Sequence, residues 1–73
     1  MTFGKRLNQI RKERKLTAQA MSDILNIGLR SYRAYESDDR EPCFSNLIKI
    51  ADYLDVSIDY LLCRDEFLSK HVD

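Results

Sequence analysis

The chain has 73 residues, of which 44% are hydrophobic and 33% charged, and its 12 basic side chains balance 12 acidic ones. This length predicts one domain with a modest core. Two cysteines and one histidine exclude a metal site, which needs three or four converging ligands, and no cofactor is expected. The sequence has no membrane-length apolar run and no secretory leader pattern, so we expect a cytoplasmic protein in which Cys43 and Cys63 are buried or half-buried free thiols.

Sparse helix breakers and regular apolar spacing predict an all-α protein, because only two glycines and one proline interrupt the chain. Thr2, Thr17 and Ser57 are typical N-cap residues, each placed just before an apolar periodic segment. Asn26 ends one such segment, and asparagine tolerates the left-handed conformation that terminates many helices. The expected helices cover residues 3–14, 17–25, 29–37, 44–54 and 58–63.

The second and third expected helices form the most informative unit. Residues 26–28 (NIG) separate them, and we expect Ile27 to point inward and fix the angle between the two helices. Two short helices joined in this way are typical of a helix-turn-helix unit, whose second helix enters the major groove of DNA. Tyr32 and Tyr35 share one side of that helix, and Arg30 and Arg33 lie opposite.

Charge is distributed unevenly along the chain. Residues 1–36 contain eight basic and three acidic side chains, whereas residues 37–73 contain four basic and nine acidic ones. The first part is basic and also contains the expected helix-turn-helix unit. This arrangement favours contact of that part with phosphates, while the acidic part faces away from them.

Most of the chain resembles one known family. Several short segments, in order and almost without gaps over residues 3–63, are similar to the Cro/CI-repressor-like (Xre) family. The segments are FGKRL (3–7), IRKERKLT (10–17), YE (35–36), REP (40–42), LIKIA (47–51) and LDVSIDYLL (54–62). The resemblance implies a compact five-helix lambda-repressor-like DNA-binding domain over residues 1–64, followed by a tail or helix extension at 65–73. It also implies that a homodimer binds double-stranded operator DNA.

Site residues follow from the residue chemistry and the resemblance together. Arginine reads guanine O6 and N7, and leucine contacts the thymine methyl group. The start of a helix attracts phosphate, and so do basic side chains. The expected base-reading residues are Leu29, Arg30, Arg33 and Gln19, with the alternative that Leu29 folds inward. The expected backbone contacts are Thr17, Ala18, Gly28, Lys15 and Arg40, with Arg14 as a further basic candidate.

Two further sets of residues are assigned to structure and assembly. The resemblance implies a partly buried salt bridge between Arg11 and Glu36. Tyr60, Phe67 and Leu68 provide more apolar surface than a short C-terminal element hides, so we expect them in a homodimer interface, with Leu61 in the core.

An alternative function remains open at this point. Ala18 stands where the family has a DNA-contacting glutamine, and Asp38 and Asp39 stand in a loop where the family has glycine and basic residues. The resemblance implies a sequence-specific DNA-binding transcriptional regulator, a phage-type or Xre-like repressor. These departures support the alternative, a protein-interaction module of the same fold, resembling an antitoxin or anti-repressor, with weak DNA binding. No nucleophile–base pair and no phosphate-binding glycine loop is present, so no enzyme is expected.

Overall fold

The computed structural model describes residues 1–65, which contain five α-helices and no β-strand. This confirms the all-α fold class. Three helices end slightly earlier than expected: α1 and α3 by one residue and α5 by two. The helices are α1 (Phe3–Glu13), α2 (Ala18–Leu25), α3 (Leu29–Glu36), α4 (Phe44–Leu54) and α5 (Ile58–Leu61). None of them combines the length and apolar character needed to cross a membrane.

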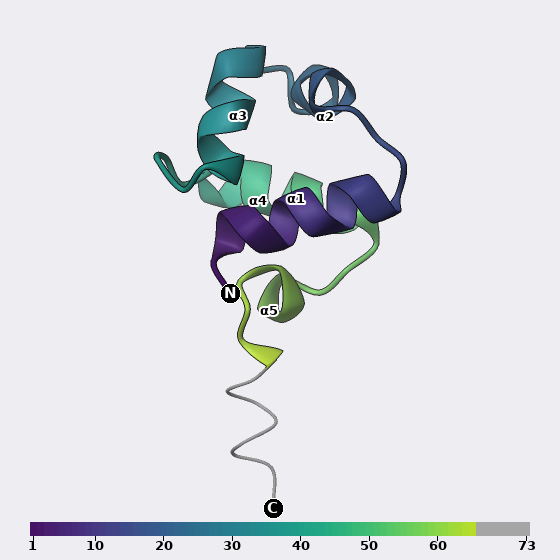
Figure 1. Cartoon of the computed structure of the whole chain (residues 1–73), viewed down its shortest axis with the longest axis vertical. Helices are drawn as coiled ribbons and strands as arrows, with labels where there is room; N and C mark the ends of the chain where they lie inside the picture. The colour runs from purple at the N-terminus through teal and green to yellow at the C-terminus, as the bar shows by residue number, and fades with distance from the viewer. Residues whose placement is uncertain (66–73) are drawn as a thin grey trace, which may run out of the picture.

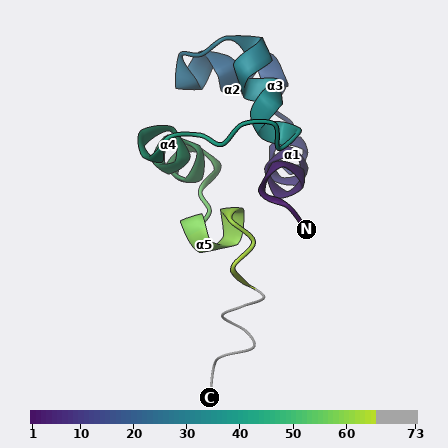
Figure 2. The ribbon, with the colours of Figure 1, turned by 90° about the vertical axis from the view of Figure 1, so that its left-hand side faces the viewer.

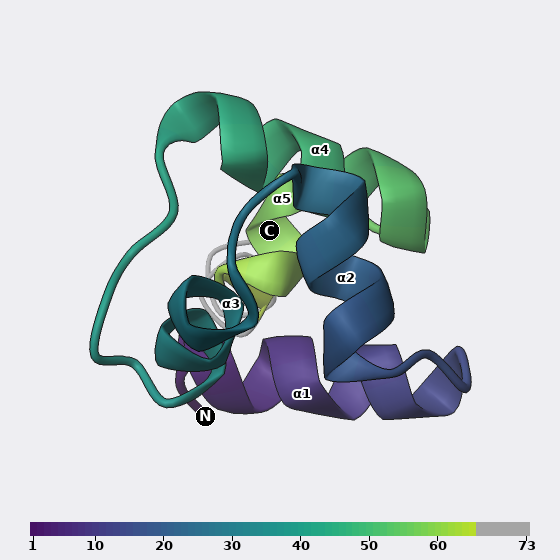
Figure 3. The same ribbon diagram turned by 90° about the horizontal axis from the view of Figure 1, so that it is seen from above.

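The helices are stacked in three levels. Helices α2 and α3 lie together at one end of the domain, α5 lies at the other, and α1 and α4 lie between them (Figures 1 and 2). Seen from above, α1 and α4 flank the domain on opposite sides, and α3 packs against both α2 and α1 (Figure 3).

Local sequence signals determine where the helices begin. The hydroxyl oxygens of Thr2, Thr17 and Ser57 each accept a hydrogen bond from the backbone N–H three residues further on, at 3.0 to 3.3 Å. These three N-caps are therefore confirmed. Each one satisfies a backbone donor that has no partner within its own helix.

Left-handed residues lie at several helix ends, and none of them is a glycine. Asn26 has φ 54° and ends α2 as expected. Asp55 ends α4 in the same conformation, with φ 56°. This backbone costs other L-residues about 1–2 kcal/mol, and less for asparagine and aspartate. The left-handed residues among 1–65 are Lys15, Asn26, Asp38, Asp55 and Cys63.

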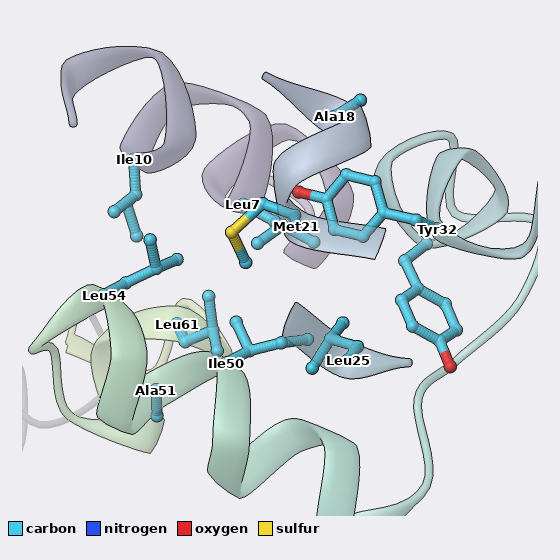
Figure 4. Packing of buried hydrophobic residues seen from close by; sticks show 11 residues of the cluster. Leu7, Ile10, Ala18, Met21, Leu25, Tyr32, Ile50, Ala51, Leu54 and Leu61 are labelled. Atoms are coloured by element: carbon cyan, nitrogen blue, oxygen red, sulfur yellow. The ribbon is translucent and has the colours of Figure 1, made fainter. Parts of the chain in front are cut away.

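The core is formed where all five helices meet (Figure 4). Leu61 is fully buried, so the short α5 seals the core from below, as expected. Ile27 and Leu29 are partly buried and pack against this cluster. The buried apolar residues are Leu7, Ile10, Ala18, Met21, Leu25, Tyr32, Tyr35, Ile50, Ala51, Leu54 and Leu61.

Arg6 is buried, although the sequence placed it in the basic half of the chain without a special role. Its side chain is 8% exposed, and its guanidinium lies 4.1 Å from the centre of the Tyr60 ring. It donates to the Tyr60 carbonyl at 3.0 Å and to the Asp65 carboxylate at 3.2 Å. Arg6 therefore fastens α5 to α1 and does not add to the basic surface.

The two cysteines are free, as expected. Cys43 is exposed, however, contrary to the expectation of buried or half-buried thiols, and Cys63 is half-buried.

Candidate nucleic-acid interface

The turn between α2 and α3 holds the two helices at a fixed angle. The Ile27 N–H donates to the Ser22 carbonyl at 3.0 Å, and the Asn26 N–H donates to the Asp23 carbonyl at 3.1 Å. The Ile27 side chain packs against the core. The turn is therefore fixed by two backbone hydrogen bonds and by the packing of the Ile27 side chain. The unit Ala18–Glu36 then leaves one face of α3 exposed to solvent.

Helix α3 has two chemically different faces. Tyr32 and Tyr35 are buried, with their rings edge to face and their centres 6.3 Å apart. Arg30 and Arg33 are exposed, and within residues 1–65 neither forms an ion pair or a side-chain hydrogen bond. Leu29 is half-buried: part of its side chain packs inward against the core, and part remains exposed beside the arginines. The outer face of α3 thus carries two guanidinium groups whose donors are available to an outside partner.

The start of α2 belongs to the same helix-turn-helix unit, and the polar side chains there already form hydrogen bonds within α2. The Thr17 hydroxyl accepts from the Ala20 N–H, and the Ala18 side chain is 9% exposed. The Gln19 amide donates to Ser22 Oγ at 3.2 Å and to Asp23 Oδ1 at 3.0 Å. Gln19 is exposed, but it must leave these intrahelical hydrogen bonds before it reaches a base.

The basic candidates for backbone contact differ in their surroundings. Lys15 and Arg40 are exposed. Arg14 donates from its guanidinium to the Leu54 carbonyl at 2.9 and 3.2 Å, and so it holds the end of α4. Gly28 begins α3 as its N-cap without a side-chain hydrogen bond, and a Cβ built on it meets nothing within 4 Å. Lys15, Arg40 and the open Gly28 position are therefore accessible, while Arg14 has a structural partner.

Arg11 and Glu36 join α1 to the end of α3. Arg11 Nε lies 2.6 Å from Glu36 Oε2 and Nη2 lies 3.1 Å from Oε1, with the two side chains 12% and 13% exposed. Asn8 donates to the same carboxylate at 2.7 Å, and Arg11 also donates to the Leu16 carbonyl at 2.8 Å. Burial opposes ionisation of Glu36, but the hydrogen bonds, led by that from Arg11, lower its pKa. The pair therefore helps to fix the orientation of α3 relative to α1.

A second exposed surface, at the start of α4, is partly apolar. Phe44 is 87% exposed and Leu62 is 39% exposed. A groove of 390 Å³ beside them is lined by both apolar and charged residues. It is lined by Phe3, Asp38, Arg40, Glu41, Pro42, Phe44, Leu47 and Leu62. The periodicity of α4 places Phe44 in line with Leu47 and Ala51, and so gave no sign of its exposure.

Of the three residues expected at a dimer interface, the structure describes Tyr60. Tyr60 is half-buried and its ring faces the Arg6 guanidinium, so part of its apolar surface is used inside the domain. Phe67 and Leu68 lie outside the described residues.

This fold and turn geometry define the class of protein. The model of the helix-turn-helix domain family matches residues 4–64, and the chain belongs to that family. Its three-dimensional structure is similar to that of the phage P22 c2 repressor in complex with a synthetic operator, with a TM-score of 0.82 and 28% identity over 89% of this chain and 98% of that one. It is also similar to a transcriptional regulator from Listeria innocua, with a TM-score of 0.81 and 28% identity, covering 94% of this chain and 70% of that one.

Curated relatives in sequence point the same way. An uncharacterised HTH-type transcriptional regulator of Bacillus subtilis, YqaE, is 50% identical over 82% of this chain and 52% of its own length. The transcriptional repressor RstR of the cryptic phage CTXphi in Vibrio cholerae is 44% identical over 88% of this chain and 57% of its own. These findings confirm the resemblance to phage-type repressors of the Xre type. The chain spans about half the length of the curated relatives it matches.

Proposed function

We propose that the chain is the DNA-binding part of a sequence-specific transcriptional regulator, a repressor of the phage type that acts in the cytoplasm. The observation that carries this is the pair of exposed arginines on α3, Arg30 and Arg33, which have no partner within residues 1–65. They stand one turn apart on the helix that enters the major groove in this class of fold. The names of the relatives, and the operator bound by the P22 repressor, support the same role.

Base recognition is assigned to the exposed side of α3 and to the start of α2. Arg30 and Arg33 donate to guanine O6 and N7, and the exposed part of Leu29 contacts a thymine methyl. Gln19 contributes after release from its hydrogen bonds to Ser22 and Asp23. The backbone contacts come from Thr17, Ala18 and Gly28 at helix starts and from Lys15 and Arg40.

The active form is proposed to be a homodimer. One short helix reads too few base pairs for useful specificity, and a two-fold dimer places two such helices about 34 Å apart, one turn of B-DNA. Tyr60, Phe67 and Leu68 are the expected contacts. The exposed Phe44 and Leu62 support an extension of this interface into the groove beside them.

A test of base recognition begins with selection of an operator from random DNA. Arg30→Ala and Arg33→Ala are then titrated against this operator and against its single-base changes at two salt concentrations. A base-reading arginine costs about 1–3 kcal/mol when removed and relaxes preference at one position. Lys49→Ala, on α4, is the charge-matched control. A uniform loss across all sequences contradicts base reading and makes the arginines phosphate contacts.

A second candidate is a protein-interaction module that resembles an antitoxin or an anti-repressor. The apolar groove beside Phe44 is the observation that favours it. Binding to phosphates weakens steeply with salt, whereas an apolar protein contact does not. Failure of the chain to bind duplex DNA at low salt, together with salt-insensitive binding to a protein partner, supports this candidate over the first.

A further inference from the structure

The carboxylate of Asp38 lies at the start of α1, far from its own position in the sequence. Its Oδ2 accepts a hydrogen bond from Thr2 Oγ1 at 2.6 Å, and its Oδ1 accepts one from the Gly4 N–H at 2.8 Å. These partners are 36 and 34 residues away along the chain. Asp38 therefore caps a helix to which it does not belong, and both of its oxygens have partners.

The start of α1 also lies very close to the end of α3, the helix that precedes Asp38. A Cβ built on Gly4 would lie 2.7 Å from the Tyr35 carbonyl oxygen and closer still to that of Glu36. Only glycine allows α1 to begin this near to the end of α3. The partial positive charge at the start of α1 thus faces the last carbonyl groups of α3 and the Asp38 carboxylate, which is a favourable arrangement of helix dipoles.

The backbone around Asp38 wraps over the end of α3. Asp38 has φ 65°, and its N–H donates to the Tyr35 carbonyl at 3.3 Å. The N–H groups of Asp39 and Arg40 both donate to the Ala34 carbonyl, at 3.0 and 3.2 Å. The backbone of Arg40 is therefore fixed from α3 on one side, while Asp38 fastens the same loop to α1 on the other.

We propose that Asp38 is a positioning residue for DNA binding: by capping α1, it fastens the loop after α3 and so fixes the backbone that carries Arg40, the expected phosphate contact. This rests on the proposed DNA-binding function. It also replaces the expectation that the Asp38 carboxylate simply repels phosphate. Asp39 differs, because its carboxylate accepts from the neighbouring Ser37 hydroxyl at 2.7 Å and has no contact with α1.

The electrostatics of Asp38 agree with this role. Hydrogen bonds from the Thr2 hydroxyl and the Gly4 N–H lower the pKa of Asp38, so the carboxylate stays ionised at the start of α1. The positive charge of Lys5, in the first turn of α1, adds to this effect.

The test compares Asp38→Gly with Asp39→Gly. Both variants remove one negative charge, so their long-range effects on DNA binding are matched. Glycine also accepts the left-handed backbone of Asp38 without strain, so the loop keeps its path while the two hydrogen bonds are lost. The probe is a short duplex of random sequence, because phosphate contacts do not depend on sequence. Binding is measured by fluorescence anisotropy between about 50 and 200 mM salt.

We expect Asp39→Gly to bind as tightly as the unaltered chain or more tightly. Asp38→Gly should bind about 3- to 10-fold more weakly than Asp39→Gly, with a salt slope smaller by about one, the effect of one lost phosphate contact. Thr2→Val removes one of the two hydrogen bonds to Asp38, together with the Thr2 cap on the Lys5 N–H, without changing the charge of the loop, and should shift affinity and slope in the same direction by a smaller amount. Asp38→Asn keeps one oxygen acceptor and should fall between the two glycine variants, and it replaces Asp38→Gly if that variant fails to fold.

Equal affinities for Asp38→Gly and Asp39→Gly, or a weaker Asp38→Gly with an unchanged salt slope, overturn the proposal while DNA binding itself stands. Absence of duplex binding by the unaltered chain overturns the proposed function and this role of Asp38 together. Hydrogen exchange at the Gly4 amide gives a readout without DNA. Exchange must become faster in Asp38→Gly and stay unchanged in Asp39→Gly, and equal rates in the two variants also overturn the proposal.

Discussion

Replacement of Glu36 by glutamine should destabilise the domain more than any exposed charge change. Glutamine has nearly the same shape and keeps one oxygen for the Asn8 amide, but it removes the charge opposite Arg11. The Arg11 guanidinium then remains in a site where only 12% of its side chain is exposed, with the Leu16 carbonyl and one neutral amide oxygen, shared with Asn8, as its acceptors in place of a carboxylate. The loss therefore measures the cost of a buried, poorly compensated cation.

The expected size follows from this burial. Removing one partner of a buried ion pair costs about 3–5 kcal/mol, and the residual exposure of both side chains places this pair near about 3 kcal/mol. A domain of this length has a free energy of unfolding of about 4–11 kcal/mol. Because 1 kcal/mol shifts the Tm of a domain this small by about 4–8 °C, the Tm should fall by about 12–24 °C.

Thermal and urea unfolding, followed by circular dichroism, measure the effect. Asp59→Asn is the matched control, because Asp59 lies 3.9 Å from Arg64 in a pair that is more than half exposed, where the expected change is below about 1 kcal/mol. A double-mutant cycle with Arg11→Met isolates the interaction. If the losses from Arg11→Met and Glu36→Gln simply add, or if Glu36→Gln costs no more than Asp59→Asn, the reasoning is refuted.

Three further predictions concern backbone and titration. Asn26→Gly should be neutral or slightly stabilising and Asn26→Val clearly destabilising, because of the left-handed backbone, and equal Tm values for the two would contradict this. Gly4→Ala should cost about 1–3 kcal/mol through its clash with α3, whereas Gly28→Ser, at an open N-cap, should gain a few tenths (about 0.3 kcal/mol), both measured by urea unfolding. Because the pKa values of Glu36 and Asp38 are lowered in the folded chain, stability should be constant above their unfolded values near about 4 and fall on further acidification, and Glu36→Gln should flatten this fall in pH-dependent melts.

Local chemistry made much of the fold predictable. The hydroxyls at Thr2, Thr17 and Ser57 and the asparagine at Asn26 act within a few residues of their own positions, so the sequence alone indicated where helices begin and end. The 3.6-residue spacing of apolar side chains likewise indicated most of the core. The same local logic placed Arg30 and Arg33 on the side of α3 opposite its tyrosines.

Contacts between distant parts of the chain escaped prediction. Arg6 carries the same charge as Lys5 beside it, and its burial depends on contacts with Tyr60 and Asp65, which are distant in sequence. The charge of Asp38 predicts only that it repels phosphate, because no residue near it in the sequence indicates that its carboxylate meets the start of α1. Gly4 offered the one local signal, since a glycine inside a helix is unfavourable and often marks a close approach.

The left-handed residues also offer a way to change the stability of the domain, and with it the concentration of the folded protein in a cell. Cys63 and Asp55 end their segments at φ 62° and 56°, beyond α3 and its arginines, and a glycine at either position relieves strain that these side chains impose. Changes of about 1–2 kcal/mol alter the steady-state abundance of marginally stable proteins several-fold, through chaperones and proteases. Occupancy of a DNA site follows the concentration of its binder. Substitution at these loop positions therefore offers a route to higher or lower occupancy of a DNA site, under the proposed function, with no change in the residues proposed to contact DNA.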